Sequence, residues 1–364
     1  MNTHVTAPSF AQSVWLVTER ELGAKLRSKS FLISTAILFA IALGGILWAG
    51  FMAGGDNRTP IAVTPDTAAV VSGNDAFDVT DAASADEARE LVRDGDVDAA
   101  IVPGGAEPLG YTVVFADDSS TTLLQQLSIS PEVEILDPDT TDGFLRYIVA
   151  LLFGVVFFAA ALTFGSTIST SVVEEKQTRV VELLISAIPV RALLAGKVIG
   201  NTILAMGQII GIAAIATVGL TVSGQDLLIA GLGGPIAWFA VFFLFGFVLL
   251  ASLFAAAGAM VSRQEDIGST ITPLTYLVMA PYLLVVFFND NPVVLTIMSY
   301  VPFSAPVGMP VRIFVGEALW WEPLLALAIM LASCVAAILI GAKIYENSLL
   351  RMGARVRLRE ALQR

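Results

Sequence analysis

The sequence predicts an all-α polytopic membrane protein with six transmembrane helices and a small α/β domain between the first and the second of them. Hydrophobic residues make up 56% of the 364 residues and charged residues only 14%, whereas a soluble globular domain carries about 25% charged residues. Apolar segments close to the ~20 residues needed to cross a bilayer recur along the chain. The acidic residues are instead concentrated in one polar stretch between two of these segments.

Six apolar segments are long enough, or nearly long enough, to be transmembrane helices. The first, residues 31–52, has an apolar stretch longer than the roughly 7–15 residues typical of a cleaved signal peptide, so we expect it to remain as a membrane anchor. The other five segments are residues 147–171, 198–222, 235–261, 270–288 and 323–343.

Residues 53–143 form the expected extracytoplasmic α/β domain. Counted over 52–143, the chain has 19 Asp and Glu residues, three Arg and no Lys, which gives a net charge of −16. The whole chain carries −12, so the remainder is net basic by 4. Ser84 and Glu87 fit a capping box that opens a helix running to Arg93. Strand-like patterns occupy residues 61–64, 97–102 and 111–115, and residues 123–127 suggest a second short helix.

The distribution of Lys and Arg indicates which ends of the spans face the cytosol. With a cytosolic N-terminus, fifteen of the twenty basic residues fall on the cytosolic side and five on the other side. We therefore expect a multi-pass protein of the cell membrane with both termini in the cytosol and the acidic domain outside. The five outer basic residues are Arg58, Arg89, Arg93, Arg146 and Arg312.

Residues 173–197 are a charged segment between two apolar runs. Charge is costly inside hydrocarbon, so this segment must lie outside the membrane core, on the cytosolic side. If it is a helix, the pairs Glu175–Arg179 and Arg179–Glu182 stabilise it by about a few tenths of a kcal/mol each. Pro189 disfavours helix at the residue before it, so we expect the helix to break there. A short surface helix joined to two spans in this way is a suitable point for a partner protein to act on.

Four further regions complete the expected organisation. Residues 144–345 hold the second to sixth spans, and residues 346–364 form a basic tail on the side where anionic lipid attracts it. Residues 290–322 are apolar but interrupted by four prolines, which suits short re-entrant or interfacial helices on the outer side. Residues 1–30 contain an amphipathic pattern that predicts a helix along the inner membrane interface. Its apolar positions are Val14, Val17, Leu22 and Leu26.

The sequence lacks the residue patterns of most enzymes. Gly196 and Lys197 resemble the end of a phosphate-binding loop, but the upstream glycine and the following Ser or Thr are missing. His4 is the only histidine and Cys334 the only cysteine, so a disulfide within the chain is excluded. We expect no catalytic residue, no metal site, no nucleic-acid partner and no energy source within the chain.

Polar side chains within the spans suit two roles. Small hydroxyl residues in membrane helices commonly pack and hydrogen-bond between helices, and we favour that role. The alternative is a substrate path, for which Asn201 and Gln208 are the better candidates because they share one face of the third span. The residues assigned to this candidate path are Ser166, Ser169, Asn201 and Gln208.

Four motifs together resemble the ABC-2 type permeases, and in particular their sodium-efflux (NatB-like) branch. The sequence ERELGAKLRSKSF at residues 19–31 resembles the entry helix of that family. EEKQTRVVELLISAIP at 174–189, followed by LAGK at 194–197, is similar to its cytosolic coupling motif. PFSAPVGMPVR at 302–312 resembles the outer loop before the last span, and KIYENSLLRMG at 343–353 resembles its exit.

This resemblance implies the permease subunit of an ATP-driven exporter, which pairs with a separate ATP-binding subunit and with a second permease copy or a paralogue. The partner ATPase would bind ATP and Mg²⁺, and this chain would hold no cofactor. Pro189 would set the angle between the coupling motif and the third span, and membrane lipid is the remaining expected partner. The residues assigned to ATPase coupling are Glu174, Glu175, Lys176, Arg179, Glu182, Pro189, Gly196 and Lys197.

The substrate and one alternative function remain open from the sequence. The branch suggests sodium, but no carboxylate within the spans supports a sodium site, so a small or amphipathic substrate stays in view. The alternative is a membrane-anchored sensor or scaffold whose acidic domain binds a cation or an envelope partner. Asp94, Asp96 and Asp98 alternate there without continuing into an EF-hand loop, which favours a solvated acidic surface.

Overall fold

The computed structural model has two compact units, Met1–Trp48 with Asp139–Arg364, and Ala49–Pro138. Each unit is described by itself. The residues that the structure describes are 8–54, 58–72, 74, 77–104, 110–115, 143–178, 180–222, 226–349 and 358–362.

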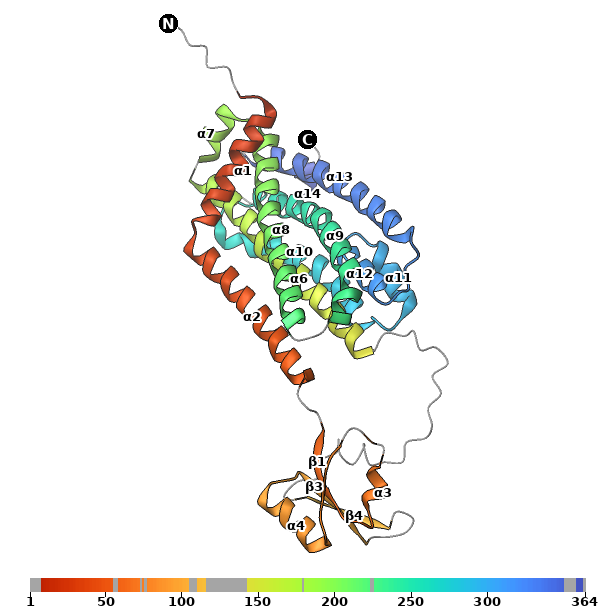
Figure 1. The fold of residues 1–364 in the computed structure, drawn as a ribbon. Coiled ribbons are helices and arrows are strands. Elements are labelled where there is room, and N and C mark those ends of the chain that lie inside the picture. Colours follow the sequence, from red (N-terminus) through yellow and green to blue (C-terminus); the bar gives the residue numbers. More distant parts are fainter. Residues whose placement is uncertain are drawn as a thin grey trace. The chain divides into compact units, whose positions relative to one another are not determined.

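The larger unit is a bundle of helices (Figure 1). Five long helices dominate it, and shorter helices lie before, between and after them. The long helices are α2 (Lys29–Gly54), α6 (Gly143–Gln177), α8 (Val190–Val222), α9 (Asp226–Ala259) and α13 (Glu322–Leu349). The others are α1 (Phe10–Leu26), α7 (Val180–Ala187), the 3₁₀ turn η1 (Gln264–Asp266), α10 (Ile267–Phe287), α11 (Pro292–Tyr300), α12 (Ala305–Phe314) and α14 (Leu358–Leu362).

Several of these helices are able to cross a membrane by their length and composition. Among the described residues, five meet that criterion on their own: α6, α8, α9, α10 with its preceding 3₁₀ turn, and α13. A sixth is counted if α1 and the first part of α2, which are bent by 69° at a short break, form one span. The expectation of a mostly helical, polytopic membrane protein is confirmed, and the described residues contain five or six candidate spans.

Helix α9 lies at the centre of the bundle, packed against α6, α8, α12 and α13. Its Phe243 stacks on Phe247 and meets Phe157 of α6 edge-on, with ring centroids 5.8 Å and 6.0 Å apart. Gly258 lies so close to α6 that a Cβ atom there would be 2.7 Å from the carbonyl oxygen of Ser169. Close approach at small residues is the usual basis of helix association in lipid, where burial of apolar surface gives little gain.

The proline-interrupted region forms two short helices, as its sequence predicts. Asn291 caps α11, and its side-chain oxygen accepts hydrogen bonds from the backbone N–H groups of Val293 and Val294. Every residue of α12 from Ala305 to Arg312 is buried. Helix α12 is therefore an integral part of the bundle interior, whereas α11 is buried only at Leu295 and Ser299.

The smaller unit contains a four-stranded sheet in the order β2-β1-β3-β4. β1 pairs in parallel with β2 and β3, and β4 is antiparallel to β3. The sheet has an apolar cluster on each face, one including Val71 of α3 and the other Ala88 and Val92 of α4. Ser84 caps α4 by accepting a hydrogen bond from the backbone N–H of Glu87, as the sequence predicts. The elements are β1 (Thr59–Val63), α3 (Ala68–Val71), β2 (Phe77–Asp81), α4 (Ala85–Asp94), β3 (Ala99–Pro103) and β4 (Tyr111–Phe115).

The suggested helix at residues 123–127 lies outside the described residues.

Candidate functional site

The predicted coupling segment consists of the end of α6, the short helix α7 and the start of α8. The break expected at Pro189 is present, because α7 ends at Ala187 and α8 begins at Val190. A second break, which the sequence did not predict, separates α6 from α7. The Thr178 hydroxyl there donates a hydrogen bond to the carbonyl of Glu174, 2.8 Å away, and the Thr178 backbone N–H donates to the same carbonyl. Arg179 lies outside the described residues, so its two expected ion pairs are untested.

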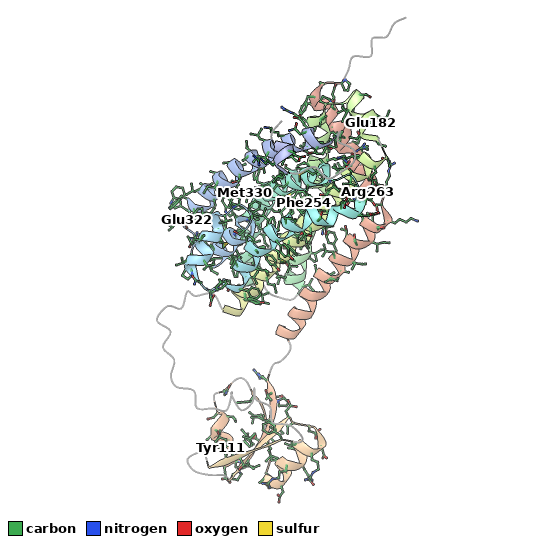
Figure 2. The ribbon with its side chains drawn as sticks, turned by 180° about the vertical axis from the view of Figure 1, so that it is seen from behind. Tyr111, Glu182, Phe254, Arg263, Glu322 and Met330 are labelled. Atoms are coloured by element: carbon green, nitrogen blue, oxygen red, sulfur yellow. The ribbon has the colours of Figure 1, made fainter. Side chains whose placement is uncertain are left out.

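Helix α7 presents a mixed apolar and polar surface. Glu182, Leu183 and Ser186 are exposed, and Leu183 keeps 74% of its surface accessible. Val181, on the opposite side of the helix, is fully buried in the bundle core. Glu182 lies near one end of the bundle and Glu322 near the other (Figure 2). We refer to Glu182, Leu183 and Ser186 as the α7 ridge.

Directly behind this segment, the Lys197 ammonium joins three helices. Its Nζ atom lies 2.8 Å from Oε1 of Glu21 on α1, 2.9 Å from Oε1 of Glu175 on α6 and 2.8 Å from the Ser171 hydroxyl. Lys197 is fully buried, and the two carboxylate side chains are only 10% and 13% exposed. Arg20 also donates hydrogen bonds to both carboxylates. We call Arg20, Glu21, Glu175 and Lys197 the Lys197 cluster.

Helix α1 lies along the first half of α8 (Figure 1). A Cβ atom at Gly196 would lie 2.5 Å from the Cβ of Val17, so only glycine permits this approach. The Thr18 hydroxyl donates to the carbonyl of Gly196 over 3.3 Å. The absence of a side chain at Gly196 therefore brings Glu21 within reach of Lys197, one residue along α8.

Lys176, the neighbour of Glu175, makes a second buried link. Its Nζ donates hydrogen bonds to the carbonyl of Ala259 at the end of α9 (2.8 Å) and to that of Ser348 in α13 (2.9 Å). Lys176 is fully buried. These bonds tie the end of α6 to two other spans at the same end of the bundle.

The structure thus divides the predicted coupling residues into two groups. Glu174, Glu182 and Pro189 are exposed and able to meet a partner. The sequence analysis also assigned direct contact with a partner to Glu175 and Lys176. Their positions do not agree with that prediction, because both side chains turn into the bundle. Gly196 and Lys197 are buried as well. The buried residues are Lys176, Gly196 and Lys197, with Glu175 mostly buried.

The N-terminal helix also differs from its expected amphipathic pattern. Its buried positions are largely polar, whereas large apolar side chains face outward. Trp15 and Leu16 are 59% and 52% exposed. An apolar outer face is suited to lipid or to a partner surface, which agrees with a helix at the membrane interface. The buried residues of α1 are Ser13, Val17, Thr18 and Glu21.

The four candidate path residues make separate contacts in the described part of the chain. The buried Ser169 hydroxyl donates to the carbonyl of Phe254 in α9, 2.5 Å away, which is the packing role that the sequence favours. Ser166 donates to the carbonyl of Thr163 within its own helix. Asn201 donates to the carbonyl of Lys197, and its buried side-chain oxygen has no partner among the described residues. Gln208 is partly exposed.

A second buried ion pair lies at the opposite end of the bundle. The Arg312 guanidinium of α12 is 2.9 Å from the Glu322 carboxylate at the start of α13, and the Tyr300 hydroxyl of α11 donates to that carboxylate over 2.9 Å. Burial and the nearby Glu322 charge raise the pKa of the Tyr300 hydroxyl, so it remains a proton donor. This network holds the two short helices against the last span.

Sequence reasoning did not identify the charged partners of these two clusters. Arg20 and Glu21 occur in the N-terminal motif, and Arg312 occurs in the outer one, but none was assigned a role. Glu21 shares a helical face with Val17 and Thr18, which is an unusual position for a carboxylate in an apolar stripe. The position of Glu21 on this face was the sequence signal that could have indicated a buried ion pair.

With this geometry in place, we compared the chain with known proteins. Residues 29–343 match the family described as ABC-2 family transporter protein. The chain belongs to the ABC-2 family. Members of this family are membrane subunits of transporters and normally work with an ATP-binding subunit. The family and the spans together make this ABC-2 protein a multi-pass membrane protein and the membrane component of a transporter.

Two relatives are similar to this chain, and the description of neither names a substrate. YhaP of Bacillus subtilis, described as uncharacterized, is 26% identical over 400 aligned residues that cover 93% of this chain and 95% of that protein. An uncharacterized protein of Methanocaldococcus jannaschii is 26% identical over 216 residues, which cover 57% of this chain and 51% of that protein. No solved structure matches this ABC-2 protein.

Proposed function

We propose that this chain is the permease subunit of an ATP-driven exporter and that a separate ATP-binding subunit acts on the α7 ridge. The observation that carries the proposal is that an exposed short helix, α7, is flanked in the chain by two helices, α6 and α8, that a buried ionic cluster joins. Leu183 is 74% exposed beside Glu182 and Ser186. A large apolar side chain rimmed by polar groups is typical of the centre of a protein–protein interface.

The Lys197 cluster gives the ridge a connection to the spans. Force applied to α7 reaches the end of α6 and the start of α8 because both helices flank it in the chain. Lys197 fixes these two ends to each other and to α1 through Glu21 and Glu175. Lys176 extends the connection to α9 and α13. Pro189 sets the angle at which α7 meets α8, and the exposed Glu174 extends the contact surface.

The remaining parts of the transporter follow from the family and from the charge distribution. ATP and Mg²⁺ bind to the partner ATPase, and a second permease copy or a paralogue completes the membrane part. Both termini and the α7 ridge face the cytosol, since fifteen of the twenty Lys and Arg residues then lie on that side. The acidic domain is extracytoplasmic in this orientation, and the protein lies in the cell membrane.

For the substrate, we favour a small or amphipathic molecule over sodium. A carboxylate that a nearby cation already neutralises is a poor ligand for sodium. Among the described residues, the buried carboxylates Glu21, Glu175 and Glu322 are each paired with Lys or Arg. Asn201 and Gln208 remain the proposed path residues, because the Asn201 side-chain oxygen is buried and has no partner among the described residues.

The experiment tests whether α7 is the docking surface. The permease is co-expressed with its ATPase, and the double substitution Glu182→Lys with Leu183→Asp is compared with Glu317→Lys, an exposed carboxylate between α12 and α13. We expect the α7 variant to reach the membrane in normal amount, to lose at least tenfold in co-purified ATPase and to lose export. The control variant should retain both. Unchanged co-purification and export in the α7 variant would refute the proposal.

Among the described residues of the smaller unit, no observation favours the sensor alternative. Within the described part of the chain, no group of three His, Cys, Asp or Glu side chains is placed to hold a metal ion.

A further inference from the structure

A cavity of about 870 Å³ lies in the larger unit between α8, α9 and α13. Its walls are mainly apolar, and they include Ile199 and Ile203 of α8, Val248 of α9 and Leu339 of α13. None of the residues assigned to the substrate path or to the α7 ridge lines it. We refer to this cavity as the α8–α13 groove.

The walls of the groove lie within helices that are long and apolar enough to cross a membrane. Ile203 and Leu339, from two different helices, are 44% and 66% exposed. Side chains of this kind that are exposed at membrane depth face lipid hydrocarbon. The groove therefore receives an alkyl chain from the side, and its volume is in the range of pockets that enclose small-molecule ligands, roughly 300–1,000 Å³.

One end of the groove is polar and carries a net positive charge. Arg191 at the start of α8 and Lys343 near the end of α13 face one carboxylate, Glu346. The Arg191 guanidinium donates to both oxygens of Glu346, from Nε over 2.6 Å and from Nη2 over 3.3 Å. An arginine has five N–H donors, so further donors remain for an acceptor oxygen. Lys343 is exposed and has no ion-pair partner among the described residues.

We propose that the α8–α13 groove binds an anionic phospholipid of the membrane, with an acyl chain along the apolar walls and the phosphate at Lys343 and Arg191. The two requirements of such a lipid, an apolar slot at membrane depth and a cationic end at the headgroup level, coincide here. Basic pockets between transmembrane helices bind anionic headgroups in this way. Glu346 holds the Arg191 guanidinium in place and disfavours a second anion beside it.

The groove is also placed to link lipid binding to the packing of the bundle. The Arg191–Glu346 ion pair joins α8 to α13, and residues of these two helices line the walls of the groove. Asn347, which also lines the polar end, donates to the carbonyl of Ala361 in α14, 2.7 Å away. A lipid bound here contacts both spans and stabilises their present separation. The proposal does not depend on the identity of the exported substrate.

The test uses the full-length protein, purified in a nonionic detergent and titrated with phosphatidylglycerol or with phosphatidylcholine of the same acyl chains. Native mass spectrometry counts the lipids bound per chain. Lys343→Gln removes the free cation, and its control is Arg263→Gln, an exposed basic residue at the same end of the bundle. Ile203→Trp fills the slot, and its control is Ile210→Trp, an exposed position on the same helix outside the groove.

We expect wild type and both controls to bind one phosphatidylglycerol per chain in preference to phosphatidylcholine. Lys343→Gln should weaken phosphatidylglycerol binding about fivefold, the effect of one basic residue near an anionic headgroup, and leave phosphatidylcholine unchanged. Ile203→Trp should abolish binding of both lipids. If that variant does not fold, Leu339→Trp replaces it, since the exposed Leu339 tolerates a larger side chain.

Equal binding of the two lipids by wild type would overturn the proposal. So would a Trp variant with normal lipid occupancy. A Trp variant that keeps its lipid and loses a dimer present in wild type would assign the groove to contact between copies of the chain, and would also overturn it.

Discussion

Replacing Lys197 with methionine removes the one ammonium that joins α1, α6 and α8. The substitution keeps the length and the apolar stem of the side chain, so it changes charge far more than volume. Glu21 and Glu175, which are both hydrogen-bonded to this ammonium, would then share only Arg20 as a cationic partner. The change in the free energy of unfolding of this variant therefore measures the contribution of the ionic contacts.

The expected loss in the free energy of unfolding is about 3 kcal/mol. Removing one partner of a buried ion pair generally costs about 3–5 kcal/mol, because the remaining charge stays buried without compensation. We take the lower end because Arg20 remains and because the two carboxylates are 10% and 13% exposed. A loss of this size changes the folded-to-unfolded ratio by roughly a hundredfold.

The assay is denaturant titration of the purified protein in mixed micelles, together with limited trypsin digestion of the basic stretch at the end of α1. The double variant Lys197→Met, Glu21→Gln should recover about half of the loss, because it neutralises the carboxylate that has lost its partner while Glu175 keeps Arg20. The single variant should also be cleaved faster at Lys25 and Arg27, since α1 loses its anchor. Wild-type stability and unchanged cleavage in the single variant would show that the cluster does not hold α1 in place.

Three further variants test other contacts by the same titration. Gly196→Leu should cost about 1–3 kcal/mol through overpacking against Val17, whereas Gly207→Ala, where a Cβ atom meets open space, should be close to neutral. Arg312→Leu should cost about 3–5 kcal/mol because Glu322 is left buried without its cation, and adding Glu322→Gln should restore part of it. Lys176→Met should cost about 1–3 kcal/mol for each of the carbonyls of Ala259 and Ser348 left without a donor, and the exposed Lys29→Met should change little. Equal values for a variant and its control would contradict the corresponding contact.

The membrane spans were predictable because the bilayer imposes their length and composition. Residues 147–171 lie within α6 and residues 323–343 within α13, with ends displaced by a few residues. Features that depend only on residues close together in the sequence were predicted equally well. Ser84 caps α4 through the N–H of a residue three positions ahead, and Pro189 interrupts the helix at its own position.

The inward rotation of Glu175 was not predictable from the same kind of pattern. Its partners, Arg20 and Lys197, are distant from it in the sequence. A search for ion pairs between residues three or four positions apart cannot find them. The face of α1 was misread for a related reason. In a soluble protein the apolar face of a helix marks the core, but at a membrane the apolar face also turns outward to lipid. Trp15 and Leu16 form such an outward apolar face.

The Lys197 cluster also determines where this molecule is able to bend. Since one ammonium holds α1 to the ends of α6 and α8, these three segments are expected to move as a single lever when α7 is displaced. The lever ends at Arg27 and Ser28, where the chain turns by 69° into α2. Beyond that bend, the described contacts of α2 with the bundle include Phe31 against Phe164 and Phe39 against Gly211. On the proposed function, a displacement of α7 would thus swing α2 about this bend relative to the rest of the bundle.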